Sequence, residues 1–205
     1  MDKKNIEKQK RIESYESNRL EMLNQGFNEN IGIISILKAN LMAFITAAPI
    51  VVVCFILYML KWNTISFSFE GNGIFMLILY FPVMAFFFAI HEVIHGISWS
   101  LFCKDKWKSI HLGVVWEKLT PYCHCKEPLK FGGYIFGGLM PLMILGIGLF
   151  AISYFIGSGA LMFISLINIL GAGGDITIAL MLLKYRDAYI LDHPTECGFI
   201  AFTKN

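Results

Sequence analysis

Residues 76–95, MLILYFPVMAFFFAIHEVIH, decide the fold of this chain: they are a long apolar run that ends in two histidines and a glutamate. Between Glu70 and Lys104 the only Asp, Glu, Lys or Arg is Glu92. A helix needs ~20 apolar residues to cross the roughly 30 Å hydrocarbon core of a bilayer. The sequence therefore predicts a transmembrane helix over residues 72–90, with the helix continuing to about residue 103.

Three further stretches have the same character. No charged residue lies between Lys38 and Lys61, and between Lys130 and Lys184 the only one is Asp175. We predict spans at 39–60, 134–157 and 159–183, the last two joined in an antiparallel hairpin by the turn at 157–159. Helices satisfy their own backbone groups in lipid, whereas a barrel would show ~10-residue alternating segments. The predicted fold class is an all-α membrane protein with about four transmembrane helices.

The composition supports this class. The chain of 205 residues is 56% hydrophobic and 16% charged, whereas soluble domains are about 45–50% apolar and about 25% charged. This excludes a disordered protein, a secreted disulfide scaffold and a nucleic-acid-binding domain. The lipid bilayer is an expected partner; the oligomeric state cannot be read from the sequence.

The distribution of Lys and Arg predicts the orientation. Seven precede the first span, one lies between spans one and two, six between spans two and three, none in the 157–159 turn and three after the last span. Positive residues favour the cytoplasmic side. We therefore expect a multi-pass protein of the cytoplasmic membrane with both termini in the cytoplasm. Residues 1–38 would be a cytoplasmic segment with a surface helix, 39–184 the membrane domain and 185–205 a cytoplasmic tail.

The cytoplasmic loop 104–133 has the pattern of a β-hairpin. Residues 110–116 are β-prone, and residues 118–121 form a plausible turn before a second strand at 122–126. Such a hairpin could offer a free edge near Val114 and Val115 to an extended substrate, although it could equally be a plain cap. Cys123-His124-Cys125 lacks the spacing typical of structural zinc, so a reduced strand or turn is expected there, and the five cysteines are not expected to form disulfides.

The motif that indicates chemistry is His91-Glu92-Val93-Ile94-His95. Residues four apart lie on one face of a helix, so both imidazoles can bind one zinc ion. Glu92 then flanks the ion and can take a proton from a water that zinc has acidified. The alternative is a buried hydrogen-bonded cluster of the same side chains. Because ionisable groups inside a membrane are costly, a functional role is the default hypothesis.

A catalytic zinc site has three protein ligands and one open position. Asp175 is the strongest candidate for the third ligand. It lies nine residues before Lys184, as His95 lies nine before Lys104, so both would sit ~13–14 Å inside the cytoplasmic boundary. His124 is the rival ligand, and pairing of Asp175 with Asn168 is the non-metal alternative.

These motifs resemble a bacterial membrane family of zincin peptidases. The resemblance rests on residues 91–96 (HEVIHG), 120–129 (TPYCHCKEPL), 138–141 (GLMP) and 173–175 (GGD), and covers roughly 75–185. It implies a zinc-dependent peptidase.

The same residues are also distantly similar to the site-2 proteases, intramembrane zinc enzymes in which a later membrane segment supplies an Asp ligand after Asn-Leu-Leu-Pro. Residues 168–171 here read Asn-Ile-Leu-Gly and are followed by Asp175. The chain departs from that pattern in having Gly171 for the proline and no Leu before Asp175.

The sequence thus predicts a membrane-embedded zinc metalloprotease that cleaves a membrane-associated protein or peptide. His91, His95 and Asp175 would hold zinc and Glu92 would be the general base. The alternative is a non-catalytic metal-binding membrane protein with a sensor, transport or interaction role, which would have no need of Glu92.

Overall fold

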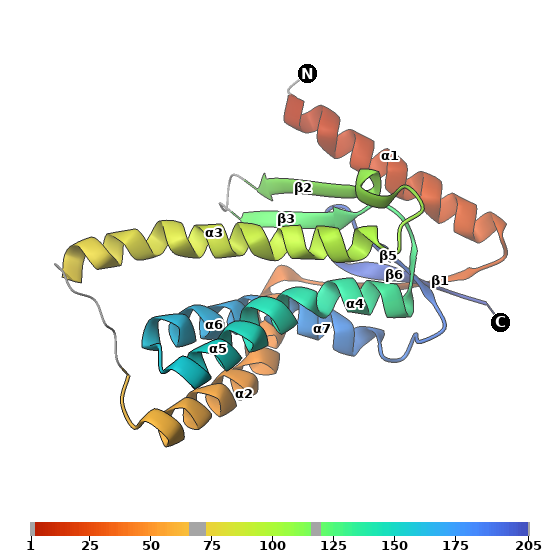
Figure 1. Ribbon diagram of the computed structural model, residues 1–205. Helices are drawn as coiled ribbons and strands as arrows, with labels where there is room; N and C mark the ends of the chain where they lie inside the picture. Colours follow the sequence, from red (N-terminus) through yellow and green to blue (C-terminus); the bar gives the residue numbers. More distant parts are fainter. Residues whose placement is uncertain (1–2, 66–72, 116–119, 205) are drawn as a thin grey trace.

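The computed structural model describes residues 3–65, 73–115 and 120–204 (Figure 1). Within these residues three helices are long and apolar enough to cross a membrane, and a bent helix pair would add a fourth span. The three are Ile36–Trp62 (α2), Tyr80–Ser100 within Gly73–Ser100 (α3), and Phe131–Ile156. The last consists of α4 (Phe131–Pro141), a π-helical stretch (Leu142–Gly148) and α5 (Leu149–Ile156).

These helices coincide with the predicted spans. Residues 39–60 and 134–157 fall on α2 and on the continuous helix that ends at Ile156, and α3 covers 73–90 and continues to Ser100. Residue 72 lies outside the described residues. Gly157 ends α5 in the left-handed conformation, with φ 75°, and Ser158 caps the next helix by accepting from the Leu161 N–H. The predicted turn therefore joins α5 to α6.

The fourth predicted span is broken. α6 (Gly159–Gly171) and α7 (Gly173–Leu182) are bent by 41° at Ala172. Directly after the break Gly173 packs against the backbone of α2, where a Cβ would lie 2.2 Å from the Ala43 carbonyl oxygen. The glycine thus allows α7 to begin in contact with α2, and Asp175 lies in the first turn of α7.

Strands from both ends of the chain, together with a short strand before α4, form a four-stranded antiparallel sheet in the order β1-β6-β5-β4. The strands are Asn28–Ile34 (β1), Leu129–Lys130 (β4), Tyr189–Asp192 (β5) and Cys197–Thr203 (β6). Both faces are buried at β6, whereas the edge strand β1 is partly or fully exposed. Ile200 and Phe202 pack with Tyr15 of helix α1 (Lys3–Asn24), whereas Phe199 and Ala201 pack with the core that contains Trp99 and Leu182. The prediction of an all-α fold was therefore wrong at both ends of the chain, where the predicted N-terminal segment and tail pair with each other.

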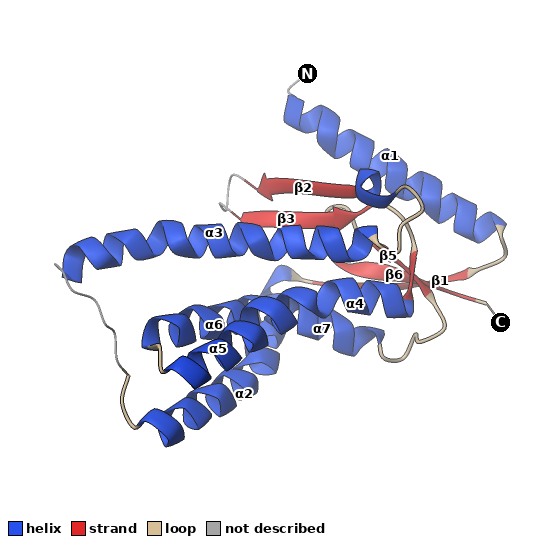
Figure 2. Cartoon of the chain, in the orientation of Figure 1, coloured by secondary structure: helices blue, strands red, loops and turns tan. Residues whose placement is uncertain are grey.

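The predicted hairpin is confirmed. β2 (Ile110–Val115) pairs antiparallel with β3 (Thr120–Cys125) after a short 3-10 helix, Lys106–Ser109. The hairpin lies between α1 and the C-terminal half of α3 (Figure 2). Its turn, residues 116–119, is outside the described residues. All five cysteines are free, as predicted, and Cys123 and Cys125 lie in β3.

Candidate metal centre and its cleft

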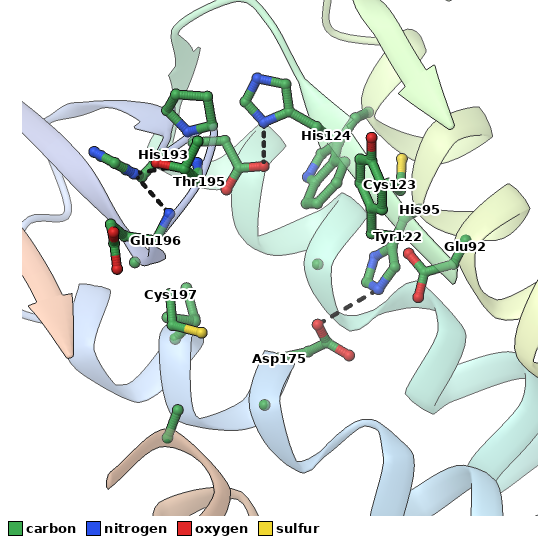
Figure 3. A pocket seen from close by; sticks show the side chains of 18 of the residues that line it. Glu92, His95, Tyr122, Cys123, His124, Asp175, His193, Thr195, Glu196 and Cys197 are labelled. Carbon is green, nitrogen blue, oxygen red and sulfur yellow. Dashed lines mark hydrogen bonds and ion pairs between the residues drawn. The ribbon is translucent and has the colours of Figure 1, made fainter. Parts of the chain in front are cut away.

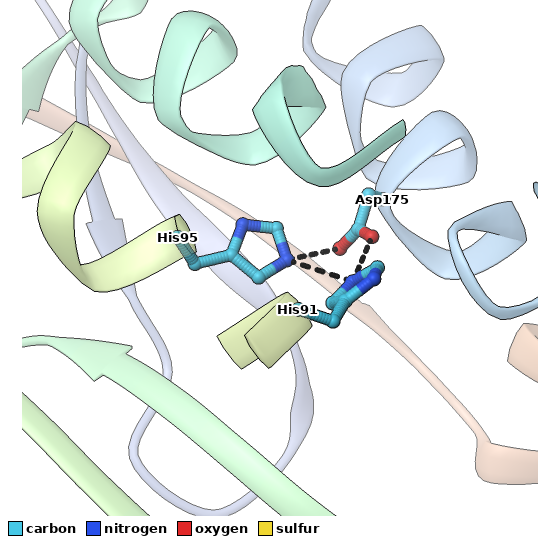
Figure 4. Close-up of side chains that lie close together, drawn as sticks. All are labelled: His91, His95 and Asp175. Atoms are coloured by element: carbon cyan, nitrogen blue, oxygen red, sulfur yellow. Dashed lines mark hydrogen bonds and ion pairs between the residues drawn. The ribbon is translucent and has the colours of Figure 1, made fainter. Parts of the chain in front are cut away.

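Three side chains from two distant helices meet at one point (Figure 4). The Nε2 atoms of His91 and His95, one turn apart on α3, are 3.2 Å from each other. Asp175 of α7 places one carboxylate oxygen 3.2 Å from the His91 Nε2 and the other 3.4 Å from the His95 Nε2. The two imidazoles are buried and the Asp175 side chain is 26% exposed. The cluster is thus closed on the imidazole side and accessible past Asp175.

The tautomer of His95 is fixed by a backbone group. Its Nδ1 lies 2.9 Å from the Gly137 carbonyl oxygen of α4. A carbonyl only accepts, so Nδ1 carries the proton and Nε2 presents its lone pair to the cluster. An outer hydrogen bond of this kind is typical of a histidine that binds a metal.

The donor set and its spacing fit zinc. Two neutral imidazoles and one carboxylate are ligands that zinc accepts. Ligand atoms about 2.0–2.1 Å from a tetrahedral ion are about 3.3 Å from one another. The two Nε2 atoms are 3.2 Å apart, each lies 3.2–3.4 Å from a different oxygen of Asp175, and one ligand atom from each residue lies within 4.8 Å of the other two.

The side chains packed around His95 also hold its ring in place. Its ring stacks on Trp99, one turn later on α3, at 5.0 Å between centroids. The Trp99 Nε1–H donates to the Tyr134 carbonyl at 2.9 Å. Gly137 allows this arrangement, because a Cβ there would lie 2.0 Å from the Trp99 Cδ1. One glycine of α4 therefore orients His95 with its carbonyl and accommodates Trp99 by lacking a side chain.

A cleft of about 1450 Å³ opens onto the cluster (Figure 3). Its wall includes His95 and Glu92 of α3, Asp175 of α7 and Cys123 of β3. The Glu92 carboxylate lies close to the backbone of Cys123 in β3. The sequence motif thus places a carboxylate in the cleft beside the three candidate ligands.

His124, the rival ligand, is held elsewhere. Its Nδ1 lies 3.1 Å from Asp192 of β5, whose other oxygen accepts from the Tyr134 hydroxyl at 2.8 Å. The metal-type cluster found among the described residues is His91, His95 and Asp175. His124 lines the same cleft but is not brought into the cluster.

The Asn168 alternative does not match the structure either. Asn168 belongs to α6, before the break, and its side-chain amide donates to the Ile164 carbonyl at 2.9 Å. Of the two hairpin residues predicted as a substrate edge, Val114 lines the cleft. Val115 pairs in register with Thr120.

Some residues of the site could not be singled out from the sequence. Gly137 acts through its carbonyl, and Asp192 reaches the cleft only because the C-terminal residues fold back as β5. The sequence could have indicated Trp99 as a neighbour of His95, since it lies four residues later on the same helix face.

The fold and this cluster define a helical protein with apolar helices and a zinc-type donor set in a cleft. Comparison with family profiles agrees: residues 84–190 match the family described as "putative zincin peptidase". The match covers just over half of the chain and includes His91, Glu92, His95 and Asp175, so the chain belongs to this family. Neither the curated proteins nor the solved structures contain a match to this chain.

Proposed function

We propose that this protein is a membrane-embedded zinc metallopeptidase that cleaves a membrane-associated protein or peptide. The observation that carries the proposal is the convergence of His91, His95 and Asp175 beside the Glu92 carboxylate in an open cleft. A purely structural site would be closed and would not need Glu92.

The proposed chemistry divides between the ion and the protein. When bound, zinc would act as a Lewis acid that makes water a nucleophile near neutral pH. The Glu92 carboxylate would take the proton from the attacking water and deliver it to the nitrogen of the leaving amine. Asp175 and the two imidazoles would hold the ion, and the Gly137 carbonyl would keep the His95 ring in place.

Membrane insertion is supported by the surfaces of the apolar helices. The most apolar part of α2 is only 17% buried, and its exposed residues include Leu41, Phe44, Val52 and Leu60. Exposure of so much apolar surface to water would be unfavourable, whereas a lipid bilayer would cover it. The strands, α1 and both chain termini lie beside the C-terminal half of α3 (Figure 1), which fits the proposal that both termini are cytoplasmic.

An extended substrate would fit the hairpin edge beside Glu92. Pro121 lies opposite Val114 and has no N–H, so this pair cannot exchange two hydrogen bonds. The Lys126 N–H donates to the Ser109 carbonyl at 2.9 Å, so these two residues form a hydrogen-bonded pair. Hydrogen-bonded and non-hydrogen-bonded pairs alternate along an antiparallel hairpin, so Leu112 with Cys123, like Val114 with Pro121, is a non-hydrogen-bonded pair. The backbone groups of Pro121 and Cys123 therefore point away from β2.

The edge that borders the candidate centre thus belongs to β3, whereas the sequence pointed to Val114 and Val115 of β2. We infer that the carbonyls of Pro121 and Cys123 accept hydrogen bonds from the backbone of the substrate, which adds as a strand. An extended chain is required because the peptide bonds of a helix are inaccessible to a nucleophile.

A comparison of three proteins tests the function. Wild type, Glu92→Gln and the control Glu13→Gln, an exposed position on α1, are purified in detergent and supplied with zinc. Each is incubated with a peptide mixture from a whole-cell tryptic digest, and new termini are read by mass spectrometry. We expect Glu92→Gln to keep its zinc and to lose at least about 100-fold in rate. Equal rates in all three, or no new termini with zinc-loaded wild type, would contradict the proposal.

A further inference from the structure

The cleft has a basic side that the proposed chemistry does not use. Lys8 and Arg11, one turn apart on α1, both line the cleft. The Arg11 guanidinium lies 5.0 Å from the ring centroid of Tyr122 in β3. Two positive side chains thus face the cleft next to the hairpin edge.

Arg11 has unused hydrogen-bonding capacity. Its Nε–H is buried and has no hydrogen-bond partner among the described residues. Arg19, two turns later on the same helix, shows the contrast, because it donates to both oxygens of Glu29 at 2.6 and 2.7 Å and also to Glu16. A buried donor without an acceptor is unfavourable, so an acceptor supplied by a ligand would be stabilising at Arg11.

The acidic side chains on the cleft wall have other partners or lie away from Arg11. Asp192 is held by His124 and Tyr134. Asp175 belongs to the metal-type cluster. Glu196 lies on the exposed β5–β6 connection. Glu92, the fourth, lies on α3, which packs on the hairpin face away from Arg11. An acceptor supplied by the occupant of the cleft would therefore satisfy the Arg11 Nε–H.

Strand geometry says which substrate residue would meet Arg11. The hairpin face that carries Ile110 and Cys125 packs on α3, where a Cβ on Gly96 would lie 3.0 Å from Ile110. The other face, which carries Tyr122, lies under Arg11. Residues directly opposite each other in a sheet project on the same face. A substrate residue opposite Tyr122 would therefore project toward Arg11, while its neighbour opposite Cys123 would lie closest to Glu92.

We propose that Arg11, assisted by Lys8, forms a subsite for the side-chain carboxylate of a substrate residue adjacent to the one opposite Cys123. The proposal rests on the proposed function and specifies its substrate class: an extended segment with an aspartate or glutamate beside the cleaved bond. A planar guanidinium with a free Nε–H suits a carboxylate, to which it can donate two parallel hydrogen bonds.

Peptide binding tests the subsite without hydrolysis. The probe is an acetylated and amidated nine-residue peptide of alternating valine and threonine with one central glutamate, labelled with a fluorophore. Its twin carries glutamine instead, and a third peptide carries glutamine with a free C-terminal carboxylate. Binding is measured by anisotropy to zinc-supplied Glu92→Gln protein in detergent, because an intact Glu92 would cleave the probes.

We expect the glutamate peptide to bind about tenfold more tightly than its twin, a difference of about 1.4 kcal/mol. The preference should vanish when Arg11→Gln is added and persist with Lys10→Gln, which removes one charge from an exposed position on the same helix. Because Arg11 also packs on Tyr122, Arg11→Lys is the second variant, and it should keep part of the preference.

Three results would overturn the subsite: binding of the twins within twofold of each other, an unchanged preference in Arg11→Gln, or binding selective for the free chain end. Absence of binding by all three peptides would also overturn it. A clear preference together with a failure of Glu92-intact protein to cleave any peptide would refute the proposed function and leave the subsite standing.

Discussion

Replacement of Gly173 by alanine should damage both the fold and the metal centre. A Cβ at this position would lie 2.2 Å from the Ala43 carbonyl oxygen and 2.8 Å from its carbon, both backbone atoms of α2. Ordinary contacts of a Cβ begin near 3.4 Å, so α2 and α7 would have to separate by about 1 Å. Gly174, the next residue, has nothing within 4 Å of such a Cβ and is the matched control.

Comparison of Gly173→Ala with Gly174→Ala isolates the free-energy cost of the steric clash with α2. Both substitutions gain about 0.5–1 kcal/mol from the lower backbone entropy of alanine in the unfolded chain. Overpacking costs about 1–3 kcal/mol, and only Gly173→Ala incurs it. The free energy of unfolding of Gly173→Ala should therefore be about 1–3 kcal/mol below that of Gly174→Ala.

The same displacement should weaken zinc binding. Asp175 follows Gly173 by two residues, and a shift of about 1 Å exceeds the ~0.2 Å tolerance of a metal–ligand distance. We expect a loss of 10–100-fold in zinc affinity, the range found when a supporting contact of a ligand is disturbed. Denaturant unfolding in mixed micelles and competition with a chromophoric chelator measure the two effects. Equal stability and equal affinity of the two alanine variants would refute the reasoning.

Three other predictions concern the surroundings of the site. Gly137→Ala, whose Cβ would lie 2.0 Å from the Trp99 ring, should lower the unfolding free energy by about 1–3 kcal/mol and change the tryptophan fluorescence, whereas Gly138→Ala has no neighbour within 4 Å and should do neither. The hydrogen bond from Arg19 lowers the pKa of Glu29 from its usual 4.5. The ion pair should therefore stabilise α1 above about pH 4.5 and cease to do so as the pH falls through the lowered pKa. Glu29→Gln should weaken the hydrogen-exchange protection of α1 by about 0.5–1 kcal/mol at pH 7 but not at acid pH, and an equal effect at both pH values would contradict this. Free zinc at 100 times its dissociation constant should stabilise the wild type by about 2.7 kcal/mol in a thermal scan, an effect that chelation should abolish.

The parts of the site that could be predicted depend on local patterns. His91 and His95 are four residues apart, which alone places them on one helix face. Asp175 was detectable because it is the single charged residue in a long apolar stretch, where an ionisable group is costly. Charge-free stretches likewise located the apolar helices to within a few residues.

The four-stranded sheet could not be predicted in the same way. β1 and β6 pair Asn28 with Thr203, so the contact joins the two ends of the chain. Residues 199–202 of β6 are all buried because both faces of this strand are covered, and a strand buried on both faces shows no alternation of apolar and polar residues. Without that sheet, neither Asp192 nor the wall of the cleft could be anticipated.

The break at Ala172 has a similar explanation. Glycines such as those at 171, 173 and 174 are compatible both with close helix packing and with an unwound backbone. The structure shows a bend of 41° and, directly after it, close contact of Gly173 with α2. Which glycine lies at the bend and which packs closely against α2 depends on the position of α2, and α2 is remote in sequence.

The most direct test of the account is the zinc content of purified protein after reconstitution, measured by elemental analysis for wild type, Asp175→Asn and His124→Ala. The account predicts one zinc per chain in wild type and in His124→Ala, and loss of zinc in Asp175→Asn. Zinc retained by Asp175→Asn but lost from His124→Ala, or no zinc in reconstituted wild type, would contradict it.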